Sequence, residues 1–208
     1  QAVPLLYTID MDHCIKCYKC VDACGPQAID FAQSPEEVEL DVGTIIAATG
    51  FDSFDPSTKE EYGYGIYENV ITGIELERIL SPSGPSGGKI VRLSDGKTPK
   101  RIAFVQCVGS RDEKTNPYCS RVCCMYTAKH AAIYKERVPD GQPYIFYMDI
   151  RSDGKDYEEF LQKTIEEKRL LYLRGRVSRV FQDDGKVRVL GVDTLTGRMV
   201  ELAADMVV

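Results

Sequence analysis

Four cysteines near the N-terminus have a spacing that could hold an iron–sulfur cluster. They follow the pattern C-x₂-C-x₂-C-x₃-C, at Cys14, Cys17, Cys20 and Cys24. Bacterial ferredoxins use this spacing, because two-residue gaps let one tight loop supply thiolates to three corners of a cubane. Gly25 separates the last cysteine from the usual proline, and no second matching run exists. We therefore expect all four cysteines to bind one [4Fe–4S] cluster, although four thiolates can also bind zinc.

A second set of four cysteines has a spacing that matches no common motif. Cys107, Cys119, Cys123 and Cys124 form the pattern C-x₁₁-C-x₃-C-C. We expect Cys107 at the carboxyl end of a buried strand, and Cys119 and Cys123 on one face of the following helix, with Cys119 in its first turn. Cys124 would lie about 100° around that helix from Cys123. It can join the others only if the helix begins late or is distorted.

The spacing of the second set leaves several interpretations open. The cysteines could hold a cluster, bind zinc, or be buried as small apolar residues. Cys123 and Cys124 could also form a redox-active vicinal pair. Structural disulfides are disfavoured, because nothing in the sequence indicates export to an oxidising compartment.

The composition is that of a soluble globular protein. The chain has 208 residues, of which 43% are hydrophobic and 28% charged, and its net charge of −6 argues against nucleic acid as a partner. It has no stretch of the roughly 18 apolar residues that a membrane span needs. Gln1 opens no signal peptide, so we expect a cytoplasmic location. The chain lacks an initiator Met and ends in an apolar run, which suggests a piece of a longer protein.

The elements predicted before residue 100 form two segments. Short strands over residues 7–10 and 28–31 flank the first cysteines, so residues 1–39 form a ferredoxin-like module whose folding depends largely on its cluster. In residues 40–99, the apolar run 42–48 predicts a buried strand. A helix over residues 72–80 follows, with Thr72 as N-cap and Glu75 completing a capping box, and a loop over residues 81–88 ends the segment.

Residues 100–208 alternate strands with helices. Strands are predicted over residues 101–108, 144–150 and 171–174, and helices over 116–137 and 156–168. Asn116 would cap the first helix, with Pro117 at its first position. Residues 177–181 and 186–192 flank the turn Asp183-Asp184-Gly185, which is typical of a hairpin. The pattern predicts an α/β fold with a Rossmann-like parallel sheet beside the small ferredoxin-like module.

Blocks of residues spread over the chain resemble one family, the heterodisulfide reductase A-type subunits, which contain flavin and iron–sulfur clusters. The blocks are residues 1–4, 14–24, 43–52, 61–65, 106–112, 118–126 and 146–151. In that family a ferredoxin module is inserted into a thioredoxin-reductase-like flavoprotein, so the resemblance implies that residues 40–99 are part of a flavoprotein domain and a linker. In the same family, a cysteine followed by C-x₃-C-C holds a second cubane. The resemblance implies that the second set binds a second [4Fe–4S] cluster through Cys107, Cys119, Cys123 and Cys124.

The resemblance also implies a flavin. The family binds FAD on an N-terminal Rossmann unit, but this chain has no G-x-G-x-x-G after a strand, so we expect that unit to be missing and isolated FAD binding to be weak or absent. Ala48-Thr49-Gly50 resembles a strand-end motif that touches the flavin, which makes Thr49 and Gly50 candidate contacts.

The implied function is electron transfer between FAD and iron–sulfur partners through two clusters, within an oxidoreductase. The implied partners are other iron–sulfur subunits, hydrogenase or formate dehydrogenase subunits, and a second copy in a homodimer of the full-length protein. We expect no catalytic residue and little activity from this piece alone. Asp149 and Arg151 are expected to form a structural ion pair. The alternatives are a zinc-stabilised scaffold and a thiol–disulfide redox protein, which would use Cys123 and Cys124.

Overall fold

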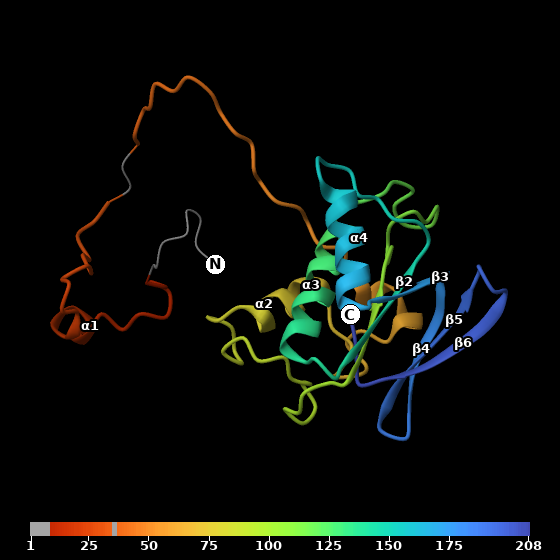
Figure 1. Cartoon of the computed structure of the whole chain (residues 1–208). Coiled ribbons are helices and arrows are strands. Elements are labelled where there is room, and N and C mark those ends of the chain that lie inside the picture. Colours follow the sequence, from red (N-terminus) through yellow and green to blue (C-terminus); the bar gives the residue numbers. More distant parts are fainter. Residues whose placement is uncertain (1–8, 35–36) are drawn as a thin grey trace. The chain divides into compact units, whose positions relative to one another are not determined.

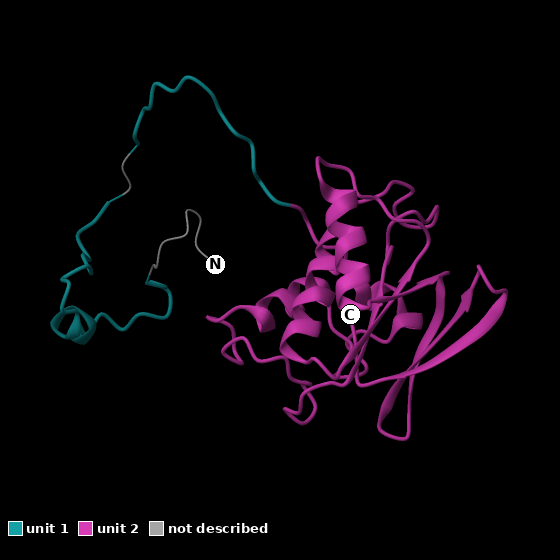
Figure 2. Ribbon diagram, in the orientation of Figure 1, with its two compact units in different colours: residues 1–50 teal, residues 51–208 magenta. Residues whose placement is uncertain are grey.

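A computed structural model describes residues 9–34 and 37–208. The chain divides into two compact units, residues 1–50 and residues 51–208 (Figure 2). Residues 51–99 thus belong to the same unit as residues 100–208. The division into residues 1–39, 40–99 and 100–208 therefore stays a prediction about the function of each segment.

The first unit consists mainly of loops. Its one regular element among the described residues is the short helix α1, Lys19–Ala23. The strand predicted over residues 28–31 does not form, and of the strand predicted over residues 7–10, residues 7 and 8 lie outside the described residues while Ile9 and Asp10 are not in a strand. A strand needs hydrogen bonds to a neighbouring strand. Among the described residues of this unit, no second strand pairs with these segments.

The apolar run 42–48 is not a buried strand either. The side chains of Ile45 and Ile46 are 86% and 84% exposed, and the segment pairs with no other strand within the described part of the chain. The prediction was wrong because an apolar run becomes a strand only where other strands pair with it and other layers cover it.

The second unit contains the predicted parallel sheet. Its strand order is β3-β2-β1-β7, and all neighbouring strands are parallel. Figure 1 shows β2 and β3 side by side. The strands are β1 (Arg101–Val105), β2 (Gln142–Tyr147), β3 (Leu171–Arg174) and β7 (Met206–Val207). The fold class predicted from the alternation of strands and helices is therefore confirmed.

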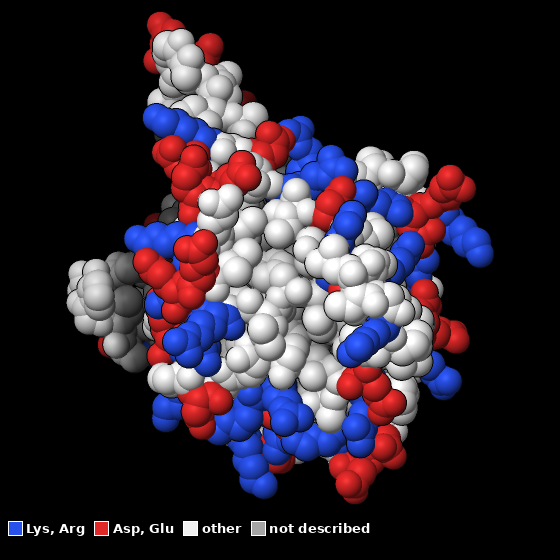
Figure 3. All heavy atoms as spheres, turned by 45° about the vertical axis from the view of Figure 1, so that its right-hand side comes forward, with Lys and Arg blue, Asp and Glu red and all other residues white. Residues whose placement is uncertain are grey.

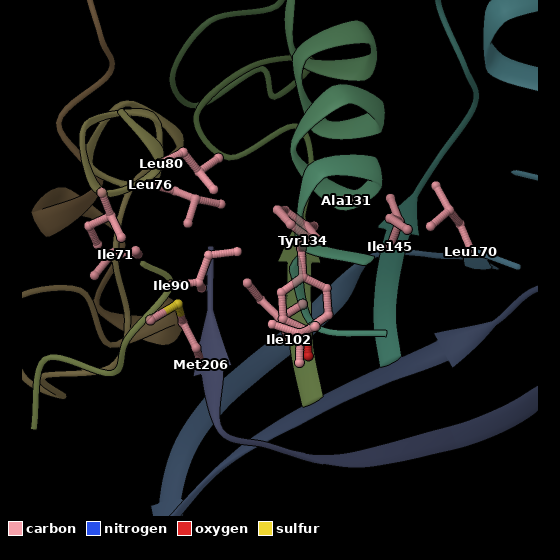
Figure 4. Close-up of a cluster of buried hydrophobic side chains, with 13 residues drawn as sticks. Ile71, Leu76, Leu80, Ile90, Ile102, Ala131, Tyr134, Ile145, Leu170 and Met206 are labelled. Carbon is pink, nitrogen blue, oxygen red and sulfur yellow. The ribbon is translucent and has the colours of Figure 1, made fainter. Parts of the chain in front are cut away.

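Helices cover one face of this sheet. They are α2 (Gly73–Leu80), α3 (Cys123–Arg137) and α4 (Tyr157–Lys168). Figure 4 shows Leu76 and Leu80 of α2 and Tyr134 of α3 packed with the strand residues Ile102 and Ile145. Because side chains alternate between the two faces of a strand, Ile102 and Phe104 join this core, whereas Ala103 belongs to the core on the opposite face.

An antiparallel sheet covers the opposite face. It has the order β4-β5-β6 and contains β4 (Val177–Asp183), β5 (Lys186–Asp193) and β6 (Arg198–Ala204). Val180 and Val189 of this sheet share a buried core with Ala103 and Phe146. Asp184 and Gly185 have φ angles of 48° and 69°, the left-handed values of a type I′ turn, so the predicted hairpin is confirmed.

The start of α3 differs from the prediction. The helix begins at Cys123 and not near Asn116, and residues 116–122 form a loop. The side-chain amide of Asn116 donates a hydrogen bond to the carbonyl of Gly109 (2.9 Å), so it holds the loop after β1 and does not cap the helix. Arg121, at φ 62°, also interrupts helical geometry just before α3.

The surface carries charges of both signs. On the face in Figure 3, lysine and arginine side chains alternate with aspartate and glutamate around a mostly uncharged centre.

Two short 3₁₀ helices, η1 (Pro56–Thr58) and η2 (Glu60–Tyr62), precede α2. Within residues 9–34 and 37–208, no helix is long and apolar enough to cross a membrane.

Candidate functional site: two sets of cysteines

The first cysteine set lies on α1 and on the turns beside it: Cys14 and Cys17 precede the helix, Cys20 is in it and Cys24 follows it. Lys16 and Tyr18 have φ angles of 54° and 57°, which bend the chain between the cysteines. Two sulfur atoms accept backbone hydrogen bonds: Cys14 from the N–H of Lys16 (3.4 Å) and Cys24 from the N–H of Ala28 (3.3 Å). Such bonds stabilise negative charge on sulfur and tune bound clusters. Cys17 and Cys20 are exposed, so they are open to a bound group.

The second cysteine set gathers at the carboxyl edge of the parallel sheet. Cys107 lies two residues beyond β1, with a left-handed φ of 63°. Cys123 and Cys124 are the first two residues of α3, and all three side chains are buried. The prediction that Cys119 and Cys123 share one helix face was wrong, because Cys119 lies in the preceding loop. From the sequence, Cys124 was expected to join the other cysteines only if the helix began late or was distorted. The helix does begin late, at Cys123.

The thiols of Cys107, Cys123 and Cys124 lie close enough to shift one another's pKa values. Hydrogen bonds from Cys107 and then Cys124 lower the pKa of Cys123 far below its usual range. The same contacts, followed by burial, raise the pKa values of Cys107 and Cys124.

Cys119 approaches the same edge from the loop before α3. Its sulfur accepts the backbone N–H of Arg121 (3.4 Å). It lines a hollow with Arg121 and residues 150–153, which follow β2. The backbone N–H of Arg151, from that same segment, donates to the sulfur of Cys124 (3.3 Å). Loops after two neighbouring strands thus surround the second set.

The residues of both sets fit a [4Fe–4S] cluster. Each offers four free thiols, the soft ligands such clusters need, and two of the four sulfur atoms in each set accept a backbone N–H. Over residues 9–34 and 37–208, no three cysteine, histidine, aspartate or glutamate side chains are already arranged around a metal position. The ligand roles of the eight cysteines therefore stay a prediction.

Charged residues beside the second set form a network that the sequence revealed only in part. The ion pair expected between Asp149 and Arg151 is present at 3.2 Å. Arg111 forms a further ion pair with Asp149. This second pair was not predicted from the sequence. Although burial opposes the shift, the bond from Arg111 lowers the pKa of Asp149. The pair could have been predicted from the sequence, because Arg111 and Asp149 lie near the carboxyl ends of two strands that were expected to be neighbours.

A cavity of about 610 Å³ lies beside Cys107 and Cys123, within residues 51–208. Its lining is mostly apolar and aromatic, but it also includes Glu77 and His130. The Nε2 atom of His130 hydrogen-bonds to the Glu77 carboxylate, while its buried Nδ1 atom has no partner in the described structure. Burial lowers the pKa of His130, which favours the neutral ring. Sequence reasoning did not single out either residue.

The candidate flavin contacts lie in the first unit. Thr49 and Gly50 are both exposed, and Gly50 has a φ of 78°. A side chain at Gly50 would meet no atom within 4 Å. Their role in binding a flavin stays a prediction.

Comparison with known proteins gives one family match. Residues 7–30 match the model of the 4Fe-4S binding domain. This segment contains the whole first cysteine set.

The whole chain is similar to several curated proteins, all of them A-type subunits of heterodisulfide reductases. It is 54% identical to the iron–sulfur A-type protein of the CoB–CoM heterodisulfide reductase of Methanocaldococcus jannaschii, and 53% identical to the second such protein of Methanopyrus kandleri. It is 50% identical to the A-type protein of the H(2):CoB-CoM heterodisulfide,ferredoxin reductase of Methanothermobacter thermautotrophicus. Each match covers 100% of this chain and 32% of the relative. The chain therefore spans about a third of these relatives' length.

Among solved structures, L-lysine 6-monooxygenase from Pseudomonas syringae matches 77% of this chain and 43% of its own, with a TM-score of 0.49 and 11% identity. A likeness at that level bears on neither fold nor function.

Proposed function

Because the chain belongs by sequence to the family of heterodisulfide reductase A-type subunits, of which it spans 32%, we propose that it relays single electrons through two [4Fe–4S] clusters. Cys14, Cys17, Cys20 and Cys24 hold the first cluster, and Cys107, Cys119, Cys123 and Cys124 hold the second. One cluster is oxidised as the other is reduced, so each transfer balances in electrons. Bound clusters supply the redox chemistry, and the chain holds and insulates them.

The position of the second cysteine set carries this proposal. Residues that are 12 to 17 positions apart in the sequence gather at the carboxyl edge of a parallel sheet, which is where doubly wound folds bind ligands. Cys107, Cys123 and Cys124 are all buried with free thiols, and the backbone N–H of Arg151 donates to the sulfur of Cys124, as expected of a ligand set. The match of residues 7–30 supports the first cluster independently.

In the whole protein, these clusters exchange electrons with FAD, and Thr49 and Gly50 contact the flavin. The name of the Methanothermobacter relative joins hydrogen, the CoB–CoM heterodisulfide and ferredoxin, and that of a Methanococcus maripaludis relative adds formate. We place this protein in such an oxidoreductase complex, with iron–sulfur subunits and hydrogenase or formate dehydrogenase as partners and a second copy as its dimer mate. Residues 1–39, 40–99 and 100–208 would serve as ferredoxin-like module, flavoprotein part and second cluster domain.

Iron and acid-labile sulfide, counted per chain in anaerobically prepared protein, test the proposal. Two cubanes predict about eight irons. Cys107→Ser and Cys14→Ser should each remove about four, and each variant is the control for the other because the sets lie in different units. A parent protein with about four irons would refute the second cluster. Zinc in place of iron after anaerobic reconstitution would refute the electron-transfer function and favour a scaffold.

A further inference from the structure

An ion pair connects the loops that follow the two central strands of the parallel sheet. Arg111 lies four residues after Cys107, and its guanidinium contacts both carboxylate oxygens of Asp149, one of them at 3.4 Å. Asp149, which follows β2, also accepts a bond from Arg151 at 3.2 Å. The carboxylate of Asp149 therefore holds two arginines at the edge where the second cysteine set gathers.

Each end of this network touches a cysteine of the second set. Arg111 follows Cys107 in the same loop and lies close enough for its positive charge to act on the Cys107 thiol. At the other end, the backbone N–H of Arg151 donates to the sulfur of Cys124, and the thiol of Cys124 lies 3.9 Å from the carbonyl oxygen of Asp149. The side chain of Arg111 is only 24% exposed, so water screens its charge incompletely.

The network carries an excess of positive charge. Two arginines share one carboxylate, which leaves a net charge of one beside the sulfur atoms. Arg121, near Cys119, is paired separately with Asp153. The positive charge next to Cys107 is thus fixed in place by Asp149 and is not the charge of a freely moving surface side chain.

We propose that Arg111, positioned by Asp149, raises the reduction potential of the second cluster. Reduction adds one negative charge to the cluster, and a fixed positive charge at one of its ligands stabilises that form. This inference rests on the proposed function, because it requires a cluster on the second set. It assigns to the ion pair the tuning of electron flow between the two clusters.

Potentiometric titration of the anaerobic holoprotein, followed by electron paramagnetic resonance, tests this role. Arg111→Gln should lower the equilibrium constant for reduction of the second cluster about tenfold, or about 59 mV for one electron. Asp149→Asn removes a negative charge but keeps an amide oxygen that can still accept a bond from Arg111, so the arginine stays in place and the potential should shift upward. Arg111→Lys keeps the charge and should stay close to the parent. The potential of the first cluster should not change in any of these variants.

Arg176→Gln is a matched control for loss of one positive charge. The guanidinium of Arg176 pairs with Asp112 at 3.2 Å and not with Asp149, so this variant should shift the second potential less than Arg111→Gln does.

Opposite shifts in Arg111→Gln and Asp149→Asn would support the charge effect. Shifts in the same direction, or none in either variant, would overturn it, because a merely structural role makes both substitutions act alike. If Arg111→Gln loses the cluster, Asp149→Asn decides: an upward shift supports the inference, and a downward shift or none overturns it. Eight irons with unmoved potentials would refute this inference alone, whereas a parent that holds no iron on the second set would refute the proposed second cluster with it.

Discussion

The residues around Cys107 adopt backbone conformations that most side chains disfavour. Cys107, Gly109 and Arg111 have φ angles of 63°, 73° and 55°. For residues other than glycine, such angles cost of the order of 1 kcal/mol or more, and they concentrate at functional sites. The loop bends repeatedly in this way because Cys107 and Arg111 must both face the second cysteine set within five residues of chain.

Gly109→Ala tests how tightly this loop is packed. A Cβ atom there would lie 2.4 Å from the ring of Phe54, in addition to the strain of a positive φ. We expect the free energy of unfolding, measured with urea, to fall by roughly 2 to 3 kcal/mol. Gly197→Ala is the control: its φ is 68°, but no atom lies within 4 Å of the added Cβ. Equal losses in both variants would show that Phe54 moves aside freely.

Among the helices, two starts were predicted from capping residues, and only the start of α2 is confirmed. Thr72 caps α2 as predicted: its hydroxyl accepts the N–H of Glu75 (3.3 Å), and the Glu75 carboxylate accepts the N–H of Thr72 (2.6 Å). Asn116 and Pro117 start no helix, because Asn116 is engaged with the loop after β1. A side chain that could cap a helix does so only where no other hydrogen bond competes for it.

Thr72→Ala tests the contribution of the capping box. Loss of the hydroxyl leaves the N–H of Glu75 without its partner at the start of α2, so we expect the free energy of unfolding in urea to fall by about 1 kcal/mol. Thr72→Ser keeps a hydroxyl that can accept the same bond, and it should recover most of the loss. Equal loss in both variants would mean that the methyl group, and not the cap, stabilises this end of the helix.

At the scale of the whole second unit, Asp205 connects the two sheets. Its carboxylate accepts the backbone N–H groups of Lys100 (2.8 Å) and Arg101 (2.9 Å), at the start of β1, and pairs with Lys186, at the start of β5. Its side chain is 7% exposed. Burial would raise its pKa, but the bonds from Lys186, Arg101 and Lys100 outweigh burial and lower the pKa.

Because the folded pKa of Asp205 lies below the unfolded value of 3.8, its stabilisation is present above that pH and is lost as pH falls through the folded pKa. Asp205→Asn should lower the free energy of unfolding at pH 7 by roughly 3 kcal/mol, since buried donors lose their charged partner. Below pH 3.8 the loss should shrink as the parent protonates. Asp140→Asn, which removes an exposed pair with Lys100, should change little. A loss in Asp205→Asn that does not depend on pH would contradict this account.

Local patterns in the sequence were enough to predict the parts of the molecule that depend on local chemistry. The spacing of the first four cysteines indicated the cluster type, because a tight loop must supply most of the ligands. Apolar runs separated by helical patterns predicted the parallel sheet, and Asp184-Gly185 predicted the hairpin turn, because these positions need left-handed φ angles. Thr72 and Glu75 predicted the start of α2.

Features that depend on partners elsewhere in the chain became clear only from the folded structure. The run 42–48 is strongly apolar, yet it lies exposed because strands form through pairing, which no local pattern contains. The start of α3 at Cys123 depended on the bond between Asn116 and Gly109, and that start placed Cys123 and Cys124 beside Cys107. The Arg111–Asp149 pair likewise required β1 and β2 to be neighbours. Residues 38 positions apart meet there because parallel strands end at the same edge of the sheet.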